Sequence, residues 1–273
     1  MTTKPKTMLS VVSALLSIKY IEKTMIKYLI HPDYEYLRPF IESLPAVFEQ
    51  EGEVIYTGRN LIKVMQAEGL AVNVKRYRKP SLFNRIVYSF FRAPKGLRAF
   101  HYPGRLLYLG FETPHPIAYI EERSGGLIGY SYFVSVQSGY TQNFYQFGHI
   151  PVEQCRQVIT EFARYTARLH EAGIYHRDYS PGNILFDKVD GVYHFSLVDI
   201  NRMSFGTVGL RKGCANFARL WGQTPLFTLL ADEYAAARNF DRNLCRKLVL
   251  KYRARFWKRY RRRHPVYYQL DIE

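Results

Sequence analysis

The segment IYHRDYSPGNILF, residues 174–186, carries side chains whose types and spacing suit phosphoryl transfer. Asp178 and Asn183 belong to the pattern H-R-D-x-x-x-x-N, which stands directly before an apolar run. Phosphoryl transfer requires a carboxylate that orients the attacking hydroxyl, together with oxygen ligands for magnesium. We therefore expect Asp178 to act as the catalytic base, and Asn183, also in the catalytic set, to bind the magnesium ion of the nucleotide.

Three further residues would complete such a site. Lys75 ends the run VNVK on a predicted strand, a setting typical of a lysine that binds nucleotide phosphates. Gly58 is the one glycine of the loop YTGRN, where the backbone would approach the nucleotide. Asp199 ends the run FSLVD, sixteen positions after Asn183, so a hairpin would return it to the same place as a second magnesium ligand. The predicted cofactors are ATP and Mg²⁺.

Each residue also has an ordinary structural explanation when it is taken alone. A lysine at a strand end is usually solvated, an aspartate often caps a turn, and Ser180-Pro181-Gly182 would bend the chain in any case. The order of the surrounding elements favours the catalytic interpretation. An amphipathic helix is followed by the H-R-D segment, then by a strand, a turn and a second strand that ends in aspartate, which is the context that the motif requires.

The elements that would position these residues fall into two groups. The first group comprises a short helix after Asp33, strands at 53–57, 60–65, 70–77, 115–122 and 127–137, and helical spacing over 82–109 with breaks at Pro94 and Pro103-Gly104. The second comprises a helix over 151–173, strands at 183–187 and 193–200, and helices from about 210 onward. Tyr88, Phe90 and Phe91 are expected in the core.

This order predicts an α+β protein with two lobes. Residues 25–137 would form a strand-rich N-lobe, and residues 138–273 a helical C-lobe that ends in a basic helix. Residues 1–24 precede a second methionine, Met25, and are expected to be a loosely held extension or a start assigned too early. Their apolar run is short and interrupted by serines, so we do not expect a secretion signal.

The charge of the chain predicts an anionic partner. The formal net charge is +16 over 273 residues, while 47% hydrophobic residues indicate an ordinary folded protein. Residues 246–264 hold ten lysines and arginines interleaved with aromatics, which is typical of a helix on an anionic membrane surface. A nucleic-acid surface has a similar pattern but leaves Asp178, Asn183 and Asp199 unexplained. We expect a cytoplasmic protein, peripheral at the inner face of the cytoplasmic membrane.

Several segments carry a resemblance to a known family. HRDYSPGN resembles the catalytic loop of the protein-kinase-like superfamily. GFETPHPIAYIEE, GYSYFVS, HRDYSPGNILF and LVDINRMSFG together resemble the bacterial lipopolysaccharide core kinases, the Kdo kinase/WaaP group, over about residues 50–240. The resemblance implies a protein-kinase-like fold and ATP-dependent phosphorylation of a sugar hydroxyl, of Kdo or heptose, in the inner core. The implied partner is lipopolysaccharide core or a lipid A precursor.

The departures from the kinase pattern leave alternatives open. Ser180 stands where protein kinases usually carry lysine, and DINRMSFG replaces Asp-Phe-Gly without a following Ala-Pro-Glu, which disfavours a protein acceptor. Residues 81–110 contain no acidic side chain to pair with Lys75, unless Glu112, Glu121 or the nucleotide does so. Their arginines and lysines form either a solvated face or an anion-binding surface. The alternatives are a kinase with another small-molecule or protein acceptor and a pseudokinase that binds nucleotide without turnover.

Overall fold

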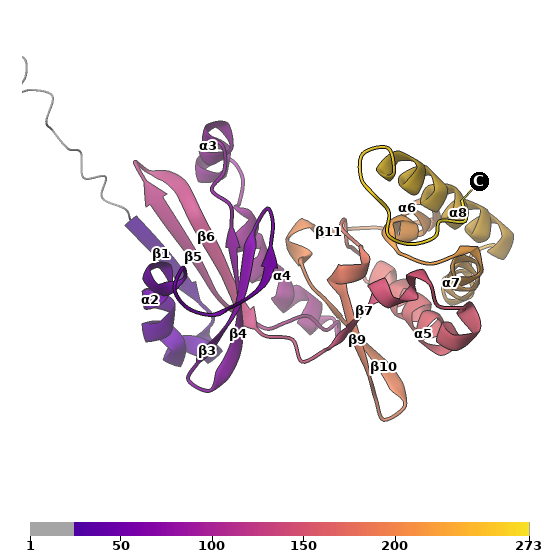
Figure 1. Cartoon of the computed structure of the whole chain (residues 1–273), viewed down its shortest axis with the longest axis horizontal. Coiled ribbons are helices and arrows are strands. Elements are labelled where there is room, and N and C mark those ends of the chain that lie inside the picture. The colour runs from indigo at the N-terminus through magenta and orange to yellow at the C-terminus, as the bar shows by residue number, and fades with distance from the viewer. Residues whose placement is uncertain (1–24, 273) are drawn as a thin grey trace, which may run out of the picture.

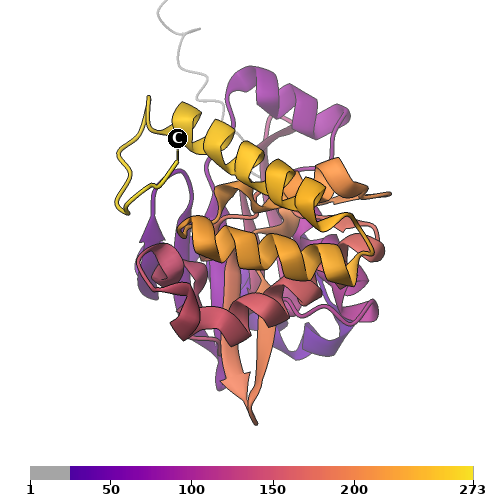
Figure 2. The ribbon, with the colours of Figure 1, turned by 90° about the vertical axis from the view of Figure 1, so that its right-hand side faces the viewer.

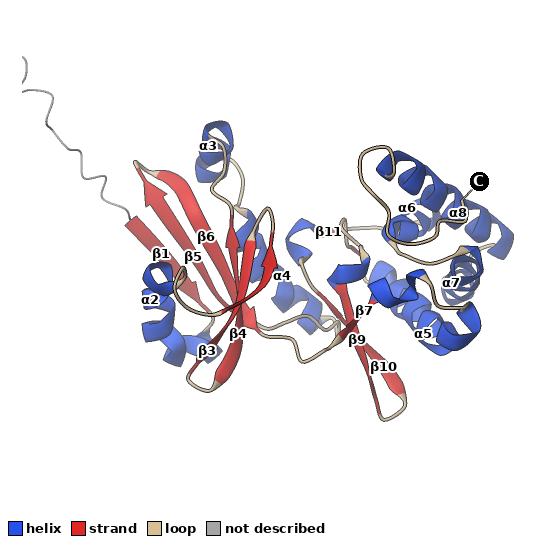
Figure 3. Ribbon diagram, in the orientation of Figure 1, coloured by secondary structure: helices blue, strands red, loops and turns tan. Residues whose placement is uncertain are grey.

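The computed structural model of the protein describes residues 25–272, so the extension expected at 1–24 lies outside the described residues. Figure 1 shows two lobes beside each other, and Figure 3 shows that strands dominate the first lobe and helices the second. The predicted two-lobed α+β fold is confirmed. Among the described residues, no helix is long and apolar enough to cross a membrane.

A six-stranded antiparallel sheet forms the N-lobe, in the order β1-β5-β6-β4-β3-β2. Its strands are β1 Met25–Ile30, β2 Glu53–Thr57, β3 Leu61–Ala67, β4 Leu70–Tyr77, β5 Pro116–Ser124 and β6 Leu127–Val136. The five predicted strands are confirmed. Strand β1 was not predicted, because its residues had been considered only as a second start of the chain.

Alternation along β4 separates its two faces, as the period of two along a strand requires. Val72 and Val74 are fully buried and pack against α2 (Arg38–Val47), which follows a 3-10 helix at Pro32–Leu37. Lys75 and Tyr77 point to the other face, which α4 (Lys95–Tyr108) covers. At Gly96 of α4, a Cβ atom would lie 2.6 Å from the ring of Tyr119, so the helix and the sheet approach closely.

The segment between β4 and β5 forms two helices, α3 (Leu82–Phe90) and α4, separated at Pro94 as predicted. The second predicted break, at Pro103-Gly104, is wrong, because α4 continues through Pro103. Proline removes one backbone donor from a helix. Here the buried neighbours Ala99 and Leu106 hold α4 against the rest of the protein, and this packing offsets the lost hydrogen bond.

The C-lobe is built around α5 (Val152–Glu171), which packs on α7 (Thr224–Ala237), while α8 (Arg242–Tyr260) covers α7, as Figure 2 shows. The remaining elements are α6 Leu210–Asn216, the strands β7 Gln142–Asn143, β8 Ile174–Tyr175, β9 Ile184–Val189, β10 Val192–Leu197 and β11 Ser204–Phe205, and 3-10 turns at Phe144–Gly148, Pro181–Asn183, Ile200–Arg202 and Phe217–Arg219. The predicted helix over 151–173 and the hairpin β9–β10 are confirmed. Asp190 and Gly191 both have positive φ, as a two-residue hairpin turn requires.

Candidate active site

The H-R-D segment forms a tight loop between β8 and β9. Ser180 N–H donates to the Asp178 carbonyl oxygen at 2.8 Å, and the Asn183 side-chain amide donates to the same oxygen at 2.8 Å. The backbone N–H of Val198 donates to the Asn183 carbonyl oxygen at 3.1 Å. These bonds hold Asp178 and Asn183 beside the strand end that carries Asp199, so three of the predicted residues come together.

His176 joins the loop to the same strand end. Its imidazole is fully buried, and its Nδ1 accepts from the backbone N–H of Asp178 at 3.1 Å. Nε2 must then carry the proton, which it donates to the Val198 carbonyl oxygen at 3.0 Å. Burial lowers the pKa of His176, so the ring is neutral at pH 7 and acts as a positioning group between Asp178 and Asp199.

Lys75 reaches Asp199 across the two lobes. Its Nζ lies 2.5 Å from Asp199 Oδ1, and the Asn201 side-chain amide also donates to this oxygen at 2.5 Å. Burial alone would raise the pKa of Asp199, but Lys75, with a smaller effect from Arg202, lowers the pKa overall. The strand lysine and the hairpin aspartate therefore meet in one place, as their positions in the sequence predicted.

The backbone of Asp199 adopts the left-handed conformation, with φ 54° and ψ 40°. This conformation is uncommon for a residue other than glycine, and such residues concentrate at functional sites. Asp199 Oδ2 and Asn183 Oδ1 have no hydrogen-bond partner within residues 25–272. One carboxylate oxygen and one amide oxygen are the kind of ligands that magnesium prefers, so these two residues fit the predicted metal.

Two arginines that were not singled out from the sequence hold the carboxylate of Asp178. Arg202 Nη1 lies 3.2 Å from Asp178 Oδ2, and Arg219 Nη1 contacts Asp178 Oδ1. Arg202 follows Asp199 by three residues and lies in DINRMSFG, the segment that replaces Asp-Phe-Gly. Arg219 lies 41 positions beyond Asp178, and only the folded chain brings it close.

Within residues 25–272, no glutamate takes the place of the helix acid that is missing from residues 81–110. Glu121 accepts from Tyr119 and Arg123, and Glu112 contacts Tyr140 and His194, so neither of these two predicted candidates contacts Lys75. That lysine instead shares the carboxylate of Asp199 with Asn201.

Helix α4 brings cations rather than acids toward this place. The pKa of Lys95 is lowered, first because the amine is partly buried and then because Arg59, Arg202 and Arg98 lie near it. Asp199 is close enough to act in the opposite direction. Gly58, which precedes Arg59, lies in the β2–β3 turn, where its N–H donates to the Asn60 carbonyl oxygen at 3.2 Å. The surroundings of Lys95 and Asp199 therefore carry a surplus of positive charge.

The other cations of 81–110 have different environments. Arg85 donates to the Ile128 carbonyl oxygen at 2.7 Å, and the Arg105 guanidinium lies 4.0 Å from the centre of the Phe205 ring. Arg85 is half-buried and has a structural role, whereas Arg105 is exposed and remains compatible with a solvated face or an anion-binding surface.

A chain of hydrogen bonds connects the helices of the C-lobe to the H-R-D loop. Arg238 donates to the Tyr234 hydroxyl at 2.9 Å, which donates to His170 Nδ1 at 2.8 Å. His170 Nε2–H donates to the Asn216 side-chain oxygen at 2.9 Å, and the Asn216 amide donates to the His176 carbonyl oxygen at 2.8 Å. Arginine can only donate and a carbonyl can only accept, so both ends of the chain fix the same direction.

A strand lysine above an H-R-D loop, with an aspartate at the end of the following hairpin, is the arrangement of the protein-kinase-like enzymes. The comparisons with known proteins give the family. The model of the lipopolysaccharide kinase (Kdo/WaaP) family matches residues 50–228, and the chain belongs to this family. The family is one of kinases, and kinases in general use a nucleotide and a divalent metal.

One solved structure, with a TM-score above 0.5, agrees with this assignment at the level of the fold. WaaP in complex with acyl carrier protein is 17% identical, with a TM-score of 0.56 over 85% of this chain and 98% of that chain. A MAP kinase from Leishmania major, LmaMPK10, is 19% identical over 74% of this chain and 60% of its own, with a TM-score of 0.38. The PknI kinase domain from Mycobacterium tuberculosis is 14% identical over 70% and 74%, also at 0.38. No curated protein matches the chain.

Proposed function

We propose that the protein transfers the γ-phosphate of ATP to a hydroxyl of an inner-core sugar, Kdo or heptose, of lipopolysaccharide. The observation that carries the proposal is the meeting of Lys75, Asp178 and Asp199 at one place in a chain of the lipopolysaccharide kinase family. A pseudokinase would have no need to keep the base and both oxygen ligands together.

The residues have separate roles in this transfer. Asp178 orients the acceptor hydroxyl and accepts its proton while the new O–P bond forms. The bond between the γ-phosphorus and the bridging oxygen breaks, and that oxygen leaves on ADP. Lys75 binds the nucleotide phosphates, to which it turns from Asp199. Asn183 and Asp199 would hold the magnesium ion, which when bound would neutralise charge on the phosphates.

Gly58 and the α4 cations support nucleotide binding in this proposal. The loop around Gly58 has no second glycine to wrap the phosphates, so affinity must come from charge. Lys95 lies near both Asp199 and Arg98, and these two α4 cations supply that charge where protein kinases carry a glutamate. The surplus of cations is best explained by a ligand with several negative charges, such as a nucleoside triphosphate.

An acceptor that is part of lipopolysaccharide would bring the protein to a membrane, and the basic stretch 246–264, which begins in α8 and continues past its end, is one candidate for the contact. Arg246 pairs with Asp232 and Arg253 is buried, whereas the other eight cations of this stretch form no ion pair within residues 25–272. These eight suit the anionic inner face of the cytoplasmic membrane. An acyl carrier protein is a further candidate partner, because the WaaP structure contains one.

The direct test is a transfer assay with purified protein, ATP, Mg²⁺ and lipid A-core oligosaccharide from cells that lack this protein. Mass spectrometry of the oligosaccharide should show the gain of one phosphate, and the same difference should separate cells with and without the protein. Absence of both differences, with ATP bound but not consumed, would establish the pseudokinase instead. ATP consumption without a product on oligosaccharide would indicate another acceptor.

A further inference from the structure

The carboxylate of Asp178 is engaged at both oxygens by groups that bind anions. Arg219 contacts one oxygen and Arg202 lies 3.2 Å from the other. The two guanidinium groups share one negative charge, so one positive charge is left over. Their side chains are 40% and 52% exposed, whereas the Asp178 side chain is 19% exposed. A solute can therefore reach both arginines.

The arginines come from separate segments of the chain, and Arg219 has a contact besides the one to Asp178. Arg202 lies in the 3-10 turn that follows Asp199, beside the cations of α4. The guanidinium of Arg219 lies 5.4 Å from the centre of the Phe256 ring of α8. Because the guanidinium group is planar, arginines bind carboxylates and phosphates through paired hydrogen bonds, which a lysine cannot form.

We propose that Arg202 and Arg219 bind an anionic group of the acceptor, a sugar carboxylate or a phosphate ester, next to the hydroxyl that is phosphorylated. The anion takes over the arginine donors, and Asp178 turns from them to the hydroxyl. This inference rests on the proposed function and names the chemistry of its acceptor. It implies that the base becomes available only when the anionic acceptor is in place.

The test compares the variants Arg202→Gln and Arg219→Gln with wild type on three acceptors. These are a core oligosaccharide with its carboxylate intact, the same oligosaccharide with the carboxylate reduced to the alcohol, and one treated with phosphatase. Each variant should raise the acceptor KM by about tenfold or more and leave the ATP KM unchanged, since each loses a charge-assisted bond. For wild type, the acceptor KM should rise by a similar factor on the modified acceptor that has lost the anion bound by the arginines. The reduced and phosphatase-treated acceptors thus separate carboxylate from phosphate.

Two results would overturn the proposal while leaving the proposed function intact. One is a wild-type enzyme that uses all three acceptors with equal KM. The other is a pair of variants that lower kcat at unchanged acceptor KM, because the arginines would then only position Asp178. Transfer to none of the acceptors by wild type would instead count against the proposed function itself. Arg211→Gln, at an exposed arginine of α6, is the matched control and should behave as wild type.

Helix α3 provides an independent observation, because it is attached to the protein by its polar side. Arg85 donates to the Ile128 carbonyl oxygen at 2.7 Å, and Ser89 Oγ accepts from the backbone N–H of Ile128 at 3.0 Å. No residue of α3 is buried. The prediction that Phe90 and Phe91 belong to the core is therefore wrong, since they are 68% and 81% exposed, and half-buried Tyr88 belongs to neither core cluster.

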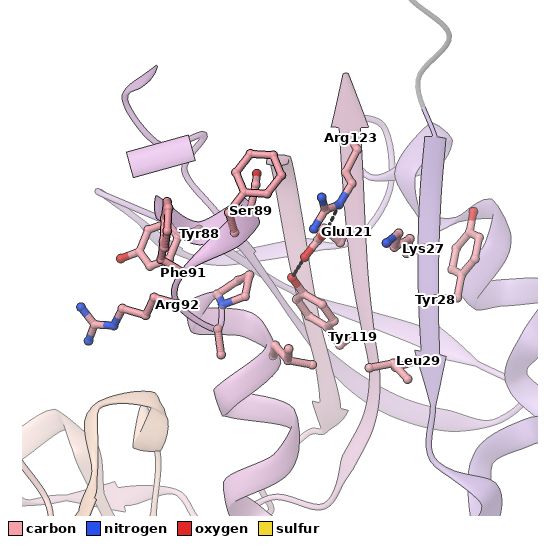
Figure 4. A pocket seen from close by; sticks show the side chains of 14 residues that line it. Lys27, Tyr28, Leu29, Tyr88, Ser89, Phe91, Arg92, Tyr119, Glu121 and Arg123 are labelled. Atoms are coloured by element: carbon pink, nitrogen blue, oxygen red, sulfur yellow. Dashed lines mark hydrogen bonds and ion pairs between the residues drawn. The ribbon is translucent and has the colours of Figure 1, made fainter. Parts of the chain in front are cut away.

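The exposed apolar residues of α3 form one stripe. Leu82, Phe83, Ile86 and Phe90 are spaced so that they share one side of a helix, and Phe91 follows directly. Cations flank this stripe at both ends, with Arg78 and Lys79 before it and Arg92 and Lys95 after it, and residues 69–111 contain no acid. Figure 4 shows the adjoining pocket of about 720 Å³, which Phe91 and Arg92 share with Lys27 and Arg123.

We infer that the apolar stripe of α3 inserts into the interface of an anionic lipid membrane, with the flanking cations at the level of the headgroups. An apolar helix face bordered by lysine and arginine is suited to that environment and poorly suited to water. In Figures 1 and 2, α3 and α8 both lie toward the upper end of the molecule, one on each lobe. One membrane surface can therefore contact both helices.

The experiment measures co-sedimentation of the full chain with vesicles of phosphatidylcholine alone or mixed with phosphatidylglycerol. The triple variant Phe83→Ser, Phe90→Ser, Phe91→Ser should bind the mixed vesicles at least about tenfold more weakly, because three aromatic rings lose their burial in lipid. The control replaces three exposed tyrosines elsewhere, Tyr36, Tyr108 and Tyr267, by serine and should change binding by less than about twofold. All six side chains are exposed, so the fold should survive, and Phe91→Ser alone provides a milder variant.

Variants of the basic stretch 246–264 distinguish its contribution to vesicle binding from that of α3. Replacing Arg261, Arg262 and Arg263 by Gln should lower the salt-sensitive part of vesicle binding and leave the salt-resistant part, which α3 supplies. Unchanged vesicle binding by the α3 variant would overturn the inference. So would a wild-type dimer that the variant converts to monomer, since the stripe would then join two copies. Vesicle binding that begins only after removal of residues 1–24 would show that these residues cover the stripe, which also overturns it.

Discussion

Lys75 and Asp199, which lie 124 positions apart in the chain, form an ion pair between the lobes at 2.5 Å. The lysine is 13% exposed and the carboxylate 27% exposed, so the pair is partly shielded from water. Both residues are proposed to bind the nucleotide, one through phosphate and one through magnesium. They hold each other until that ligand replaces the contact.

Replacing Lys75 by Met should weaken ATP binding by about tenfold or more in the presence of Mg²⁺. A charge-assisted hydrogen bond to phosphate contributes about 1.5–3 kcal/mol. Isothermal titration calorimetry with ATP measures the change directly. Lys188→Met is the control, because this exposed lysine bonds to Gln157 on the C-lobe hairpin. Equal ATP affinity in the two variants would remove Lys75 from the nucleotide site.

Asp178→Asn should abolish phosphate transfer while leaving ATP affinity and melting temperature close to wild type. A proton-accepting group acts mainly in the transition state, and its loss typically costs about 10²–10⁴-fold in rate. Asparagine keeps the shape of the side chain and one oxygen for Arg219. The assay is the initial rate of transfer at saturating ATP. More than about a tenth of the wild-type rate would contradict the role as base.

Asp199→Ala should abolish the dependence of nucleotide binding on magnesium. The variant loses a metal ligand, and Lys75 becomes free to bind phosphate without metal. The ATP affinity of wild type should therefore rise with the Mg²⁺ concentration, whereas that of the variant should stay constant. In EDTA the variant should bind ATP at least as tightly as wild type, because its Lys75 is no longer paired with Asp199. A magnesium titration identical to that of wild type would show that the metal is bound elsewhere.

The stability of the protein should fall as the pH drops from about 6.5 toward 4, partly through His170. Burial lowers the pKa of this imidazole to about 4; the hydrogen bond to Asn216 opposes this effect, and the nearby charges of Arg238 and Lys212 add to it. The unfolded chain takes up the proton near pH 6.5. Stability is therefore complete above this pH, and about 3 kcal/mol is lost by pH 4.

Urea denaturation at several pH values measures this dependence. His170→Gln retains a hydrogen-bonding side chain but cannot titrate, so its stability should change less between pH 6.5 and 4 than that of wild type. His176, whose pKa burial also lowers, contributes in the same direction in both proteins. Parallel curves for wild type and variant would assign the acid sensitivity to groups other than His170.

Arg253→Met should destabilise the protein by about 3–5 kcal/mol. Arg253 is 1% exposed and donates to Asp271 and the Gly222 carbonyl oxygen, both at 2.6 Å, so it fastens the C-terminal segment to the start of α7. Arg255→Met, two positions away on the exposed side of α8, should cost less than about 0.5 kcal/mol. Chemical denaturation of the two variants gives the comparison. Equal stabilities would mean that methionine packs well enough to replace the ion pair.

The sequence predicted the elements around the catalytic loop well, because hydrophobic periodicity and turn residues agree there. The helix that ends near Gly173, the hairpin at Asp190 and Gly191, and the strand of Lys75 all follow from local signals. Strand β1 was missed because its edge position depends on pairing with β5, which is not encoded locally. The break predicted at Pro103 was wrong because Ala99 and Leu106 are buried in the folded chain. This tertiary packing keeps the helix continuous, and the local sequence does not show it.

Helix α3 shows a second limit of pattern reading. Periodicity in residues 82–91 identifies an apolar side, but it cannot say whether that side faces the protein or the solvent. Arg85 and Ser89 decide the question through hydrogen bonds to a turn 39–43 positions away. Arg219 could not be identified from the sequence for the same reason, since its contact with Asp178 exists only in the folded chain.

The hydrogen bonds that run from Arg238 to the His176 carbonyl have a consequence for the electric field at the catalytic loop. Every donor in that chain points the same way, so the bond dipoles add rather than cancel. Their positive end points at the peptide group that leads into Arg177 and Asp178. The helical base of the C-lobe thus polarises the backbone beneath the proposed base, and it does so without placing a charged side chain there.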